Sequence, residues 1–337
     1  MNRSSGHSWI VGNAVALACL LVAAQAGAQA DAAHREWQVP RTPYGHPDLQ
    51  GYWTNASFTP VERPEALGEK AFYTDEELDR LIQEGVARGF EQTEPGTVAD
   101  VHYDLSQFGL TRGQDGFVRN NRTSIVVDPP NGRIPPMTPE GEARAAARAQ
   151  ARRENPPTDR VQNMALATRC IIWGANPPLM PIGYNSNLQI VQSPDYVMIL
   201  VEMMQDARII PLDGRAPLPE EIRQWKGSSR GYWDGDTLVI TTANFTDETA
   251  FRGASEHLVV TERLTRISDD RIRYEFTVDD PHTWVRPWSG EYPMEKTVGP
   301  IFESACHEHN YGVRNTLAGA RAEEQRQREA AAAASRP

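Results

Sequence analysis

The densest group of reactive side chains in this sequence is the run Cys306-His307-Glu308-His309. An imidazole can act as a general base, as a hydrogen-bond donor to a substrate, or as a metal ligand. His307 and His309 are two residues apart, so on a strand their side chains would share one face. Two histidines do not complete a zinc site, which has at least three protein ligands. We therefore expect His307 to act in acid–base chemistry and His309 to contact substrate. A metal site and a structural role are the alternatives.

Glu202 is a second candidate, because it is an acid inside the apolar segment 197–204. A carboxylate in such surroundings must be paired with a cation, hydrogen-bonded or protonated. A carboxyl group held in this way suits general acid or base catalysis. The sequence therefore predicts that Glu202 and His307 form an acid–base pair. A structural ion pair of Glu202 with Arg208 or Arg263 is the alternative.

Asp280 and His282 lie between two predicted strands, in the segment Asp279-Asp280-Pro281-His282. Loops at the rim of a barrel often carry functional residues. A carboxylate beside a histidine can orient its imidazole for proton transfer. We expect Asp280 and His282 to be further catalytic residues, although Asp-Asp-Pro is also typical of an ordinary turn.

Substrate-binding side chains are expected from arginines and tryptophans near these groups. Arg208 or Arg286 could hold a carboxylate or an oxyanion of the substrate. Trp284 and Trp288 could stack on a planar or sugar-like ligand. Burial of the two indole rings in a hydrophobic core is the alternative.

Most of the candidate residues lie in or beside predicted strands. Residues 187–298 contain eight strand-like segments joined mostly by short turns. Residues 196–204 are apolar on both faces, so both faces of that strand should be covered. We predict a mainly β protein with an eight-stranded antiparallel up-and-down barrel, whose interior can hold a small ligand. An open sheet or a two-sheet sandwich is the alternative. The predicted segments are 187–192, 196–204, 207–212, 230–233, 237–245, 258–267, 271–278 and 285–297.

The remaining segments are predicted to surround this barrel, which with its C-terminal segment spans residues 187–321. Residues 31–186 are expected to form an irregular wrap with a short strand at 124–128 and two helices. The first helix follows Thr74, where Thr74 and Glu77 form a capping box, and the second extends from Pro139 to about Arg153. Residues 322–337 are expected to be a frayed helix or disordered.

The N-terminus and the cysteines predict an exported protein, periplasmic or secreted. Residues 1–30 read as a signal peptide, with Arg3, an apolar core, and the cleavage site Ala28-Gln29-Ala30. Cleavage would leave Cys170 and Cys306, which in an oxidising compartment most simply pair. Two free thiols, one of them beside His307, are the alternative.

Charge and motifs narrow the classes of function. The formal net charge is −11 and no basic stripe is present, which argues against a nucleic-acid partner. After signal cleavage no segment is apolar enough to span a membrane. The sequence contains no G-x-S-x-G, H-E-x-x-H, phosphate-binding or dinucleotide-binding motif. We therefore expect a monomer that acts on a small molecule without a cofactor, with a metal as the alternative.

The mature chain contains five notable motifs, which are Thr42–Trp53, Val127–Pro136, Trp233–Val239, Phe276–Pro281 and Cys306–Glu308. They are similar to motifs of a family of exported bacterial proteins. The resemblance covers most of the mature chain and carries over no catalytic residues. The meander with a following helix, and Gly51-Tyr52-Trp53, also resemble lipocalin or calycin barrels, which include both binders and cofactor-free lyases, isomerases and cyclases.

These observations predict a cofactor-independent enzyme that acts on a small apolar or aromatic natural product. The reaction would be proton-transfer chemistry of a lyase, hydratase or dehydratase, isomerase or cyclase. A periplasmic protein that binds a small hydrophobic ligand and a metal-dependent hydrolase are the alternatives.

Overall fold

The computed structural model describes residues 37–89, 117–173, 176–181, 185–249, 251–308 and 310–335. The predicted signal peptide, residues 1–30, and His309 lie outside these ranges. The chain divides into two units, Met1–Pro40 and Arg41–Pro337. In the first unit the described residues, 37–40, contain no helix or strand. All elements below belong to the second unit.

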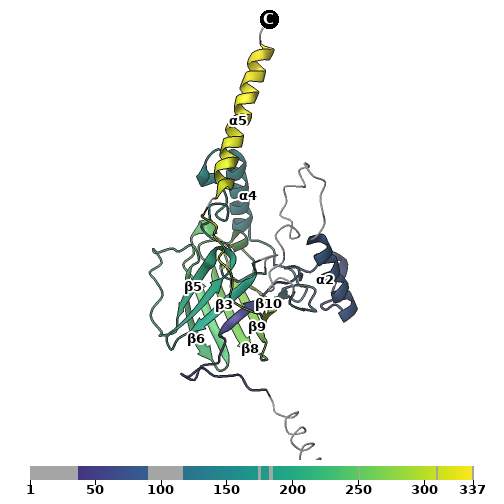
Figure 1. Ribbon diagram of the computed structural model, residues 1–337, viewed down its shortest axis with the longest axis vertical. Coiled ribbons are helices and arrows are strands. Elements are labelled where there is room, and N and C mark those ends of the chain that lie inside the picture. The colour runs from purple at the N-terminus through teal and green to yellow at the C-terminus, as the bar shows by residue number, and fades with distance from the viewer. Residues whose placement is uncertain are drawn as a thin grey trace, which may run out of the picture. The chain divides into compact units, whose positions relative to one another are not determined.

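Ten strands form one curled antiparallel sheet (Figure 1). Hydrogen-bonded neighbours follow the order β5-β4-β3-β1-β10-β9-β8-β7-β6, and β2 pairs with β10 outside this order. Side chains alternate between the inside and the outside, as in β8, where every second residue is buried. The strands are β1 Gly51–Thr54, β2 Val126–Asp128, β3 Asn187–Gln192, β4 Tyr196–Val201, β5 Asp206–Pro211, β6 Ser228–Asp234, β7 Thr237–Ala243, β8 Val259–Arg266, β9 Arg271–Asp279 and β10 Trp288–Lys296.

The sheet forms a nearly closed barrel, because its two outermost strands, β5 and β6, lie against each other. Lys226, just before β6, forms an ion pair with Asp206 at the start of β5. Further along, a Cβ atom on Gly231 would lie 2.9 Å from the side chain of Ile210 and 2.9 Å from that of Leu212. A glycine therefore lets the two strands approach closely. Because the start of β6 meets the start of β5, the two strands run in the same direction.

The predicted mainly β antiparallel barrel is confirmed, and the predicted number of eight strands is wrong. The eight predicted segments correspond to β3–β10 in order. The sheet gains β1, which pairs with both β3 and β10, and β2, which pairs with β10. Both added strands come from residues 31–186, where the short strand predicted at 124–128 corresponds to β2. Their pairing with the barrel was not predicted, because strands of four and three residues are too short for a periodic pattern to show which face is buried.

The helix that follows Thr74 begins at the capping box that the sequence indicates. The backbone N–H of Thr74 donates to Glu77 Oε2, and that of Glu77 donates to Thr74 Oγ1. Among the described residues, no helix is both long and apolar enough to cross a lipid bilayer. The α-helices are α2 Asp75–Gly89, α4 Pro139–Glu154 and α5 Tyr311–Ala334, and α5 includes most of the predicted tail. Short 3₁₀ helices span Glu65–Leu67, Val161–Asn163, Met203–Gln205, Asp247–Thr249 and Phe251–Gly253.

One end of the barrel has a polar and aromatic contact around Arg266, and we call it the Arg266 end. The Arg266 guanidinium donates to the carbonyl oxygen of Asp48 at 2.7 Å and lies 5.7 Å from the ring centroid of Trp53. The Trp53 indole donates to the carbonyl oxygen of Leu49 at 2.9 Å. Strand registers place the opposite end, the Glu202 end, at the start of β3 and β5 and the end of β4.

The predicted disulfide is confirmed, because Cys170 and Cys306 are bonded. It ties a segment that precedes the first barrel hairpin to the segment that follows the last strand. Near it, the Asn310 side chain donates to the carbonyl oxygen of Thr168 at 2.9 Å. The chain on either side of the barrel is thus fastened together at this point.

Candidate functional site

A belt of buried polar side chains lines the barrel interior. Each belt residue except Asn187 occupies the inward phase of its strand or directly follows one, and all are at most 8% exposed. Asn187 lies at the start of β3 on the phase opposite to the core residues Leu188 and Ile190, and it is buried there. The strand registers, together with the tilt of strands in a barrel, place these residues at about the same height along the barrel axis. Most other inward positions are apolar, so this belt is the polar exception within the core. The belt consists of Asn55, Asn187, Arg208, Ser229, Thr242, Glu262, Tyr274 and Tyr292.

The centre of the belt is an ion pair between strands β5 and β8. Two nitrogens of Arg208 donate to the two carboxylate oxygens of Glu262, at 3.1 and 2.6 Å. The Tyr274 hydroxyl donates to the same carboxylate at 2.7 Å. Burial opposes the charge on Arg208, but Glu262 outweighs this effect and the pKa of Arg208 is raised. Burial and then the Glu262 charge raise the pKa of Tyr274 well above its ordinary value, so its hydroxyl stays protonated.

Two tyrosine hydroxyls hold the peptide group of a residue from outside the sheet. The backbone N–H of Leu179 donates to Tyr274 Oη at 2.9 Å, and Tyr292 Oη donates to the Leu179 carbonyl oxygen at 2.6 Å. Asn55 donates to Tyr292 Oη at 3.3 Å. Leu179 is 1% exposed. The segment around Leu179 therefore reaches into the barrel, and the belt satisfies its backbone.

Two atoms of the belt lack a hydrogen-bond partner among the described residues. They are Nε of Arg208 and Oδ1 of Asn187, a donor and an acceptor that are both buried. An unpaired buried polar atom costs free energy, commonly about 1–3 kcal/mol. Such atoms in native proteins are usually satisfied by water or by a ligand. Arg208 thus offers a free donor inside the barrel, and Asn187 offers a free acceptor beside Glu202.

Glu202 lies at the end of β4 and is 2% exposed. One carboxylate oxygen accepts from the Asn187 side chain at 2.7 Å, and the other accepts from the backbone N–H of Phe302 at 3.4 Å. It therefore adjoins the belt through Asn187. The alternative ion pairs of Glu202 are absent from this arrangement, because Arg208 pairs with Glu262 and Arg263 with Asp234.

The structure does not bring His307 into hydrogen-bond contact with Glu202. His307 is exposed on the turn after the disulfide, and its backbone carbonyl accepts from the N–H of Asn310 at 3.3 Å. Its predicted companion, His309, lies outside the described residues. Within the described part of the chain, no group of three or more histidine, cysteine or acidic side chains is placed to hold a metal ion.

Asp280 shapes the connection between β9 and β10. Its carboxylate accepts from the Ser255 N–H at 2.5 Å, the Thr283 hydroxyl at 2.6 Å and the His282 N–H at 3.0 Å. Burial alone would raise the pKa of Asp280, but hydrogen bonds from Thr283 and Ser255 hold it below its ordinary value. Asp280 therefore contacts the backbone of His282 rather than its imidazole.

The imidazole of His282 pairs with a glutamate from α4. His282 Nδ1 lies 3.0 Å from a carboxylate oxygen of Glu140, and the ring stacks on that of His257 at 4.4 Å between centroids. A carboxylate at Nδ1 fixes the imidazole orientation, as in acid–base sites. This pair lies on the surface, since the side chains of His282 and Glu140 are 44% and 62% exposed.

The predicted substrate-binding residues occupy different environments. Arg208 lies in the belt, whereas Arg286 is exposed and forms an ion pair with Asp128. Trp284 and Trp288 are 3% and 0% exposed and pack edge to face, with centroids 5.8 Å apart. Both tryptophans are members of the hydrophobic core.

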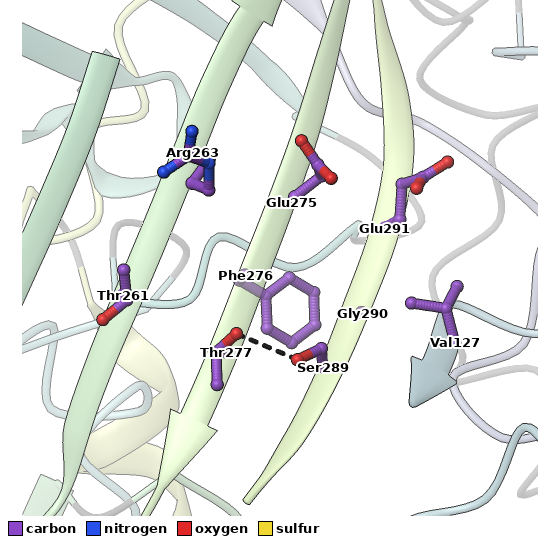
Figure 2. A pocket seen from close by; sticks show the side chains of 9 residues that line it. All are labelled: Val127, Thr261, Arg263, Glu275, Phe276, Thr277, Ser289, Gly290 and Glu291. Atoms are coloured by element: carbon purple, nitrogen blue, oxygen red, sulfur yellow. Dashed lines mark hydrogen bonds between the residues drawn. The ribbon is translucent and has the colours of Figure 1, made fainter. Parts of the chain in front are cut away.

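A groove on the outside of the barrel differs from the belt in size and in the pairing of its charged groups. Its volume is about 140 Å³, below the range of about 300–1,000 Å³ that is usual for ligand pockets. Its charged groups have ion-pair partners elsewhere on the surface, such as Asp234 for Arg263 and Arg122 for Glu291. The groove therefore lacks the unpaired polar atoms of the belt. Figure 2 shows its lining residues, which are Val127, Thr261, Arg263, Glu275, Phe276, Thr277, Ser289, Gly290 and Glu291.

Sequence reasoning missed most of the belt, although one signal was available. In β8, Glu262 lies in phase with Val260 and Leu264, so an acid interrupts an apolar row there as Glu202 does in its own segment. Tyr274 gives no such signal, because an aromatic side chain at an inward position is typical of a hydrophobic core. A comparison with models of protein families and with curated proteins finds no match for this chain.

Proposed function

We propose that this protein is an exported enzyme that performs acid–base chemistry on a small molecule bound at the polar belt. The observation that carries this proposal is the unpartnered buried acceptor Asn187 Oδ1, whose side chain contacts the carboxyl group of Glu202, together with the unpartnered buried donor Arg208 Nε in the belt. The disulfide supports export, because such bonds are typical of oxidising compartments.

The belt favours a compound with one polar oxygen group and a mainly apolar or aromatic body. Arg208 Nε would donate to a carbonyl or carboxylate oxygen, and Asn187 Oδ1 would accept from a hydroxyl group. The apolar inward residues of the neighbouring strands would contact the rest of the compound. Glu202 would take a proton from carbon and return it, as in isomerisation, elimination of water or ring closure. These groups need no cofactor for such a reaction.

The proposal is tested by mass spectrometry of a natural-product library incubated with the protein and with Glu202→Gln. The glutamine amide keeps an oxygen that can accept from Asn187, so the fold should survive while proton transfer is lost. We expect the rate of product formation to fall by about 10²- to 10⁴-fold. His307→Ala, tested in parallel, shows whether the exposed histidine assists.

A matched control is Glu220→Gln, which makes the same chemical change at an exposed residue. This variant should turn over like the wild type. Full turnover by Glu202→Gln would refute the role of Glu202. The mass change assigns the reaction, since loss of water indicates a dehydratase, gain of water a hydratase or hydrolase, and no change an isomerase or cyclase.

A second candidate function is the binding of a small hydrophobic ligand without turnover. It is favoured by the hydrogen bonds that Glu202 already accepts on both carboxylate oxygens. In the same experiment, retention of one compound by both wild type and Glu202→Gln without a new product would support a binding protein.

A further inference from the structure

A cleft of about 950 Å³ is lined by residues of α4, by residues 160–169 and by the 3₁₀ turns around Asp247 and Arg252. Its volume falls in the range that accommodates a small organic molecule rather than a single ion. Apolar side chains, including Met137, Met164 and Leu166, form part of its wall. The charged residues that line it are Arg148, Arg152, Arg160, Arg169, Arg252, Asp247 and Glu248.

Positive charge dominates this cleft in a chain whose formal net charge is −11. Five arginines line it against two acids. Within the part of the chain that the structure describes, none of the five arginines forms an ion pair. Arg152 and Arg169 also make no side-chain hydrogen bond to a described residue. Unpaired guanidinium groups around a cavity are a common basis for recognising carboxylates and phosphates.

In a second arginine-lined groove the arginines do form ion pairs, so unpaired arginines are not a general feature of the described surface. That groove, of about 270 Å³, is lined by four arginines, and each is paired with an acid. Arginines that line a surface hollow of this protein can thus be neutralised by neighbours, and those of the larger cleft are not. The pairs are Arg119 with Asp79, Arg122 with Glu291, Arg271 with Glu295 and Arg273 with Glu275.

Arg148 gives the cleft a fixed positive wall. Its guanidinium donates to the carbonyl oxygen of Asp247 at 2.8 Å and to those of Gly253 and Ala254 at 3.3 Å. These bonds hold α4 against the two 3₁₀ turns. Burial and then the nearby charges of Arg144 and Arg152 lower the pKa of Arg148, and only Asp247 opposes this effect.

We propose that the cleft binds a small organic or inorganic polyanion with at least two phosphate or carboxylate groups. Arg152 and Arg169 supply free guanidinium groups that can each hold two oxygens of an anionic group. The volume of the cleft leaves room for two such groups and a short linker. The cleft shares no lining residue with the belt, so this proposal does not depend on the proposed acid–base function.

The test is isothermal titration of the full chain in low-salt buffer with inorganic pyrophosphate and, separately, with citrate. These two probes distinguish phosphate from carboxylate recognition. We expect at least one to bind, with an affinity that falls as salt is added. The double variant R152Q/R169Q should bind that probe at least about tenfold more weakly, since it loses two charged hydrogen-bond donors.

The matched control is R153Q/R328Q, which removes the same charge from α4 and α5 outside the cleft lining. It should bind like the wild type. The single variant R152E changes an exposed residue and provides a second test, because it should abolish binding while the far-ultraviolet circular dichroism stays unchanged. The proposal would be overturned if the cleft and control variants lost the same affinity for the probe, or if the wild type bound neither probe.

Discussion

The Arg208–Glu262 pair places two opposite charges inside the barrel. Both side chains are almost fully buried, at 3% and 0% exposure. Burying two charges costs several kcal/mol for each ion, and mutual pairing offsets much of that cost. Removing one partner leaves the other charged and buried, which is worse than removing both.

We therefore predict different effects of single and double substitutions at this pair. Glu262→Gln should lower the free energy of unfolding by about 3–5 kcal/mol, because Arg208 loses its counter-ion. The double variant Arg208→Met/Glu262→Leu should be clearly more stable than Glu262→Gln. Urea unfolding of the three proteins measures this. A double variant less stable than the single one would contradict the argument.

The same pair shows why the site could be only partly predicted from sequence. Glu202 was identified because a charged side chain is unusual among apolar neighbours, and Arg208 was identified as a possible partner for a substrate carboxylate or oxyanion. The partner of Arg208 could not be deduced, because Glu262 is 54 residues away and β8 is not a hydrogen-bonded neighbour of β5. Local periodicity gives the face of a strand, but barrel curvature decides which side chains meet across the interior.

At the scale of the element, the β9–β10 connection depends on the ionised form of one side chain. Asp280 accepts hydrogen bonds from Ser255, His282 and Thr283, and its pKa is lowered in the folded protein. A lowered pKa means that the unfolded chain binds a proton more readily. The resulting stabilisation is complete above the ordinary value of 3.8 and is lost as the pH falls through the lowered folded value.

We predict that Asp280→Asn destabilises the protein at neutral pH by an amount that shrinks in acid. The asparagine cannot replace a charged acceptor of several hydrogen bonds. The measurement is the free energy of unfolding of both proteins between neutral pH and pH values below 3.8. A difference that stays constant over that whole range would show that ionisation of Asp280 is unimportant.

Strand positions were more predictable than strand number. Turn residues such as Asp234-Gly235 separate the segments, and the predicted and observed bounds of β3 agree at both ends. The short strands β1 and β2 add to the sheet through pairing with distant strands. Their place in the barrel is therefore a tertiary effect, although the local sequence at 124–128 already indicates a strand there.

At the scale of the whole molecule, the Cys170–Cys306 disulfide constrains a long stretch of the chain. The two cysteines are 136 residues apart, and most of the barrel lies between them. A cross-link over so long a loop removes many conformations from the unfolded chain. In the chain-entropy description this is worth about 4–5 kcal/mol.

We predict that Cys170→Ala/Cys306→Ala lowers the free energy of unfolding by about 3–5 kcal/mol. Dithiothreitol should destabilise the wild type by a similar amount and leave the double variant unchanged. Urea unfolding with and without reductant measures both effects. An effect of reductant on the double variant, or none on the wild type, would contradict the prediction.

The insertion of β1 also makes the number of strands around the barrel odd. Nine strands follow one another around the barrel, and an odd ring cannot alternate in direction all the way round. Somewhere two neighbours must point the same way, and here they are β5 and β6. Residues 212–227 connect the end of β5 to the start of β6, and they lead the chain back to the Glu202 end. This long connection allows β5 and β6 to run in the same direction, whereas a tight hairpin would have made them antiparallel. A four-residue strand far away in the sequence thus determines that the barrel has one lengthwise seam, and Gly231 lies on it.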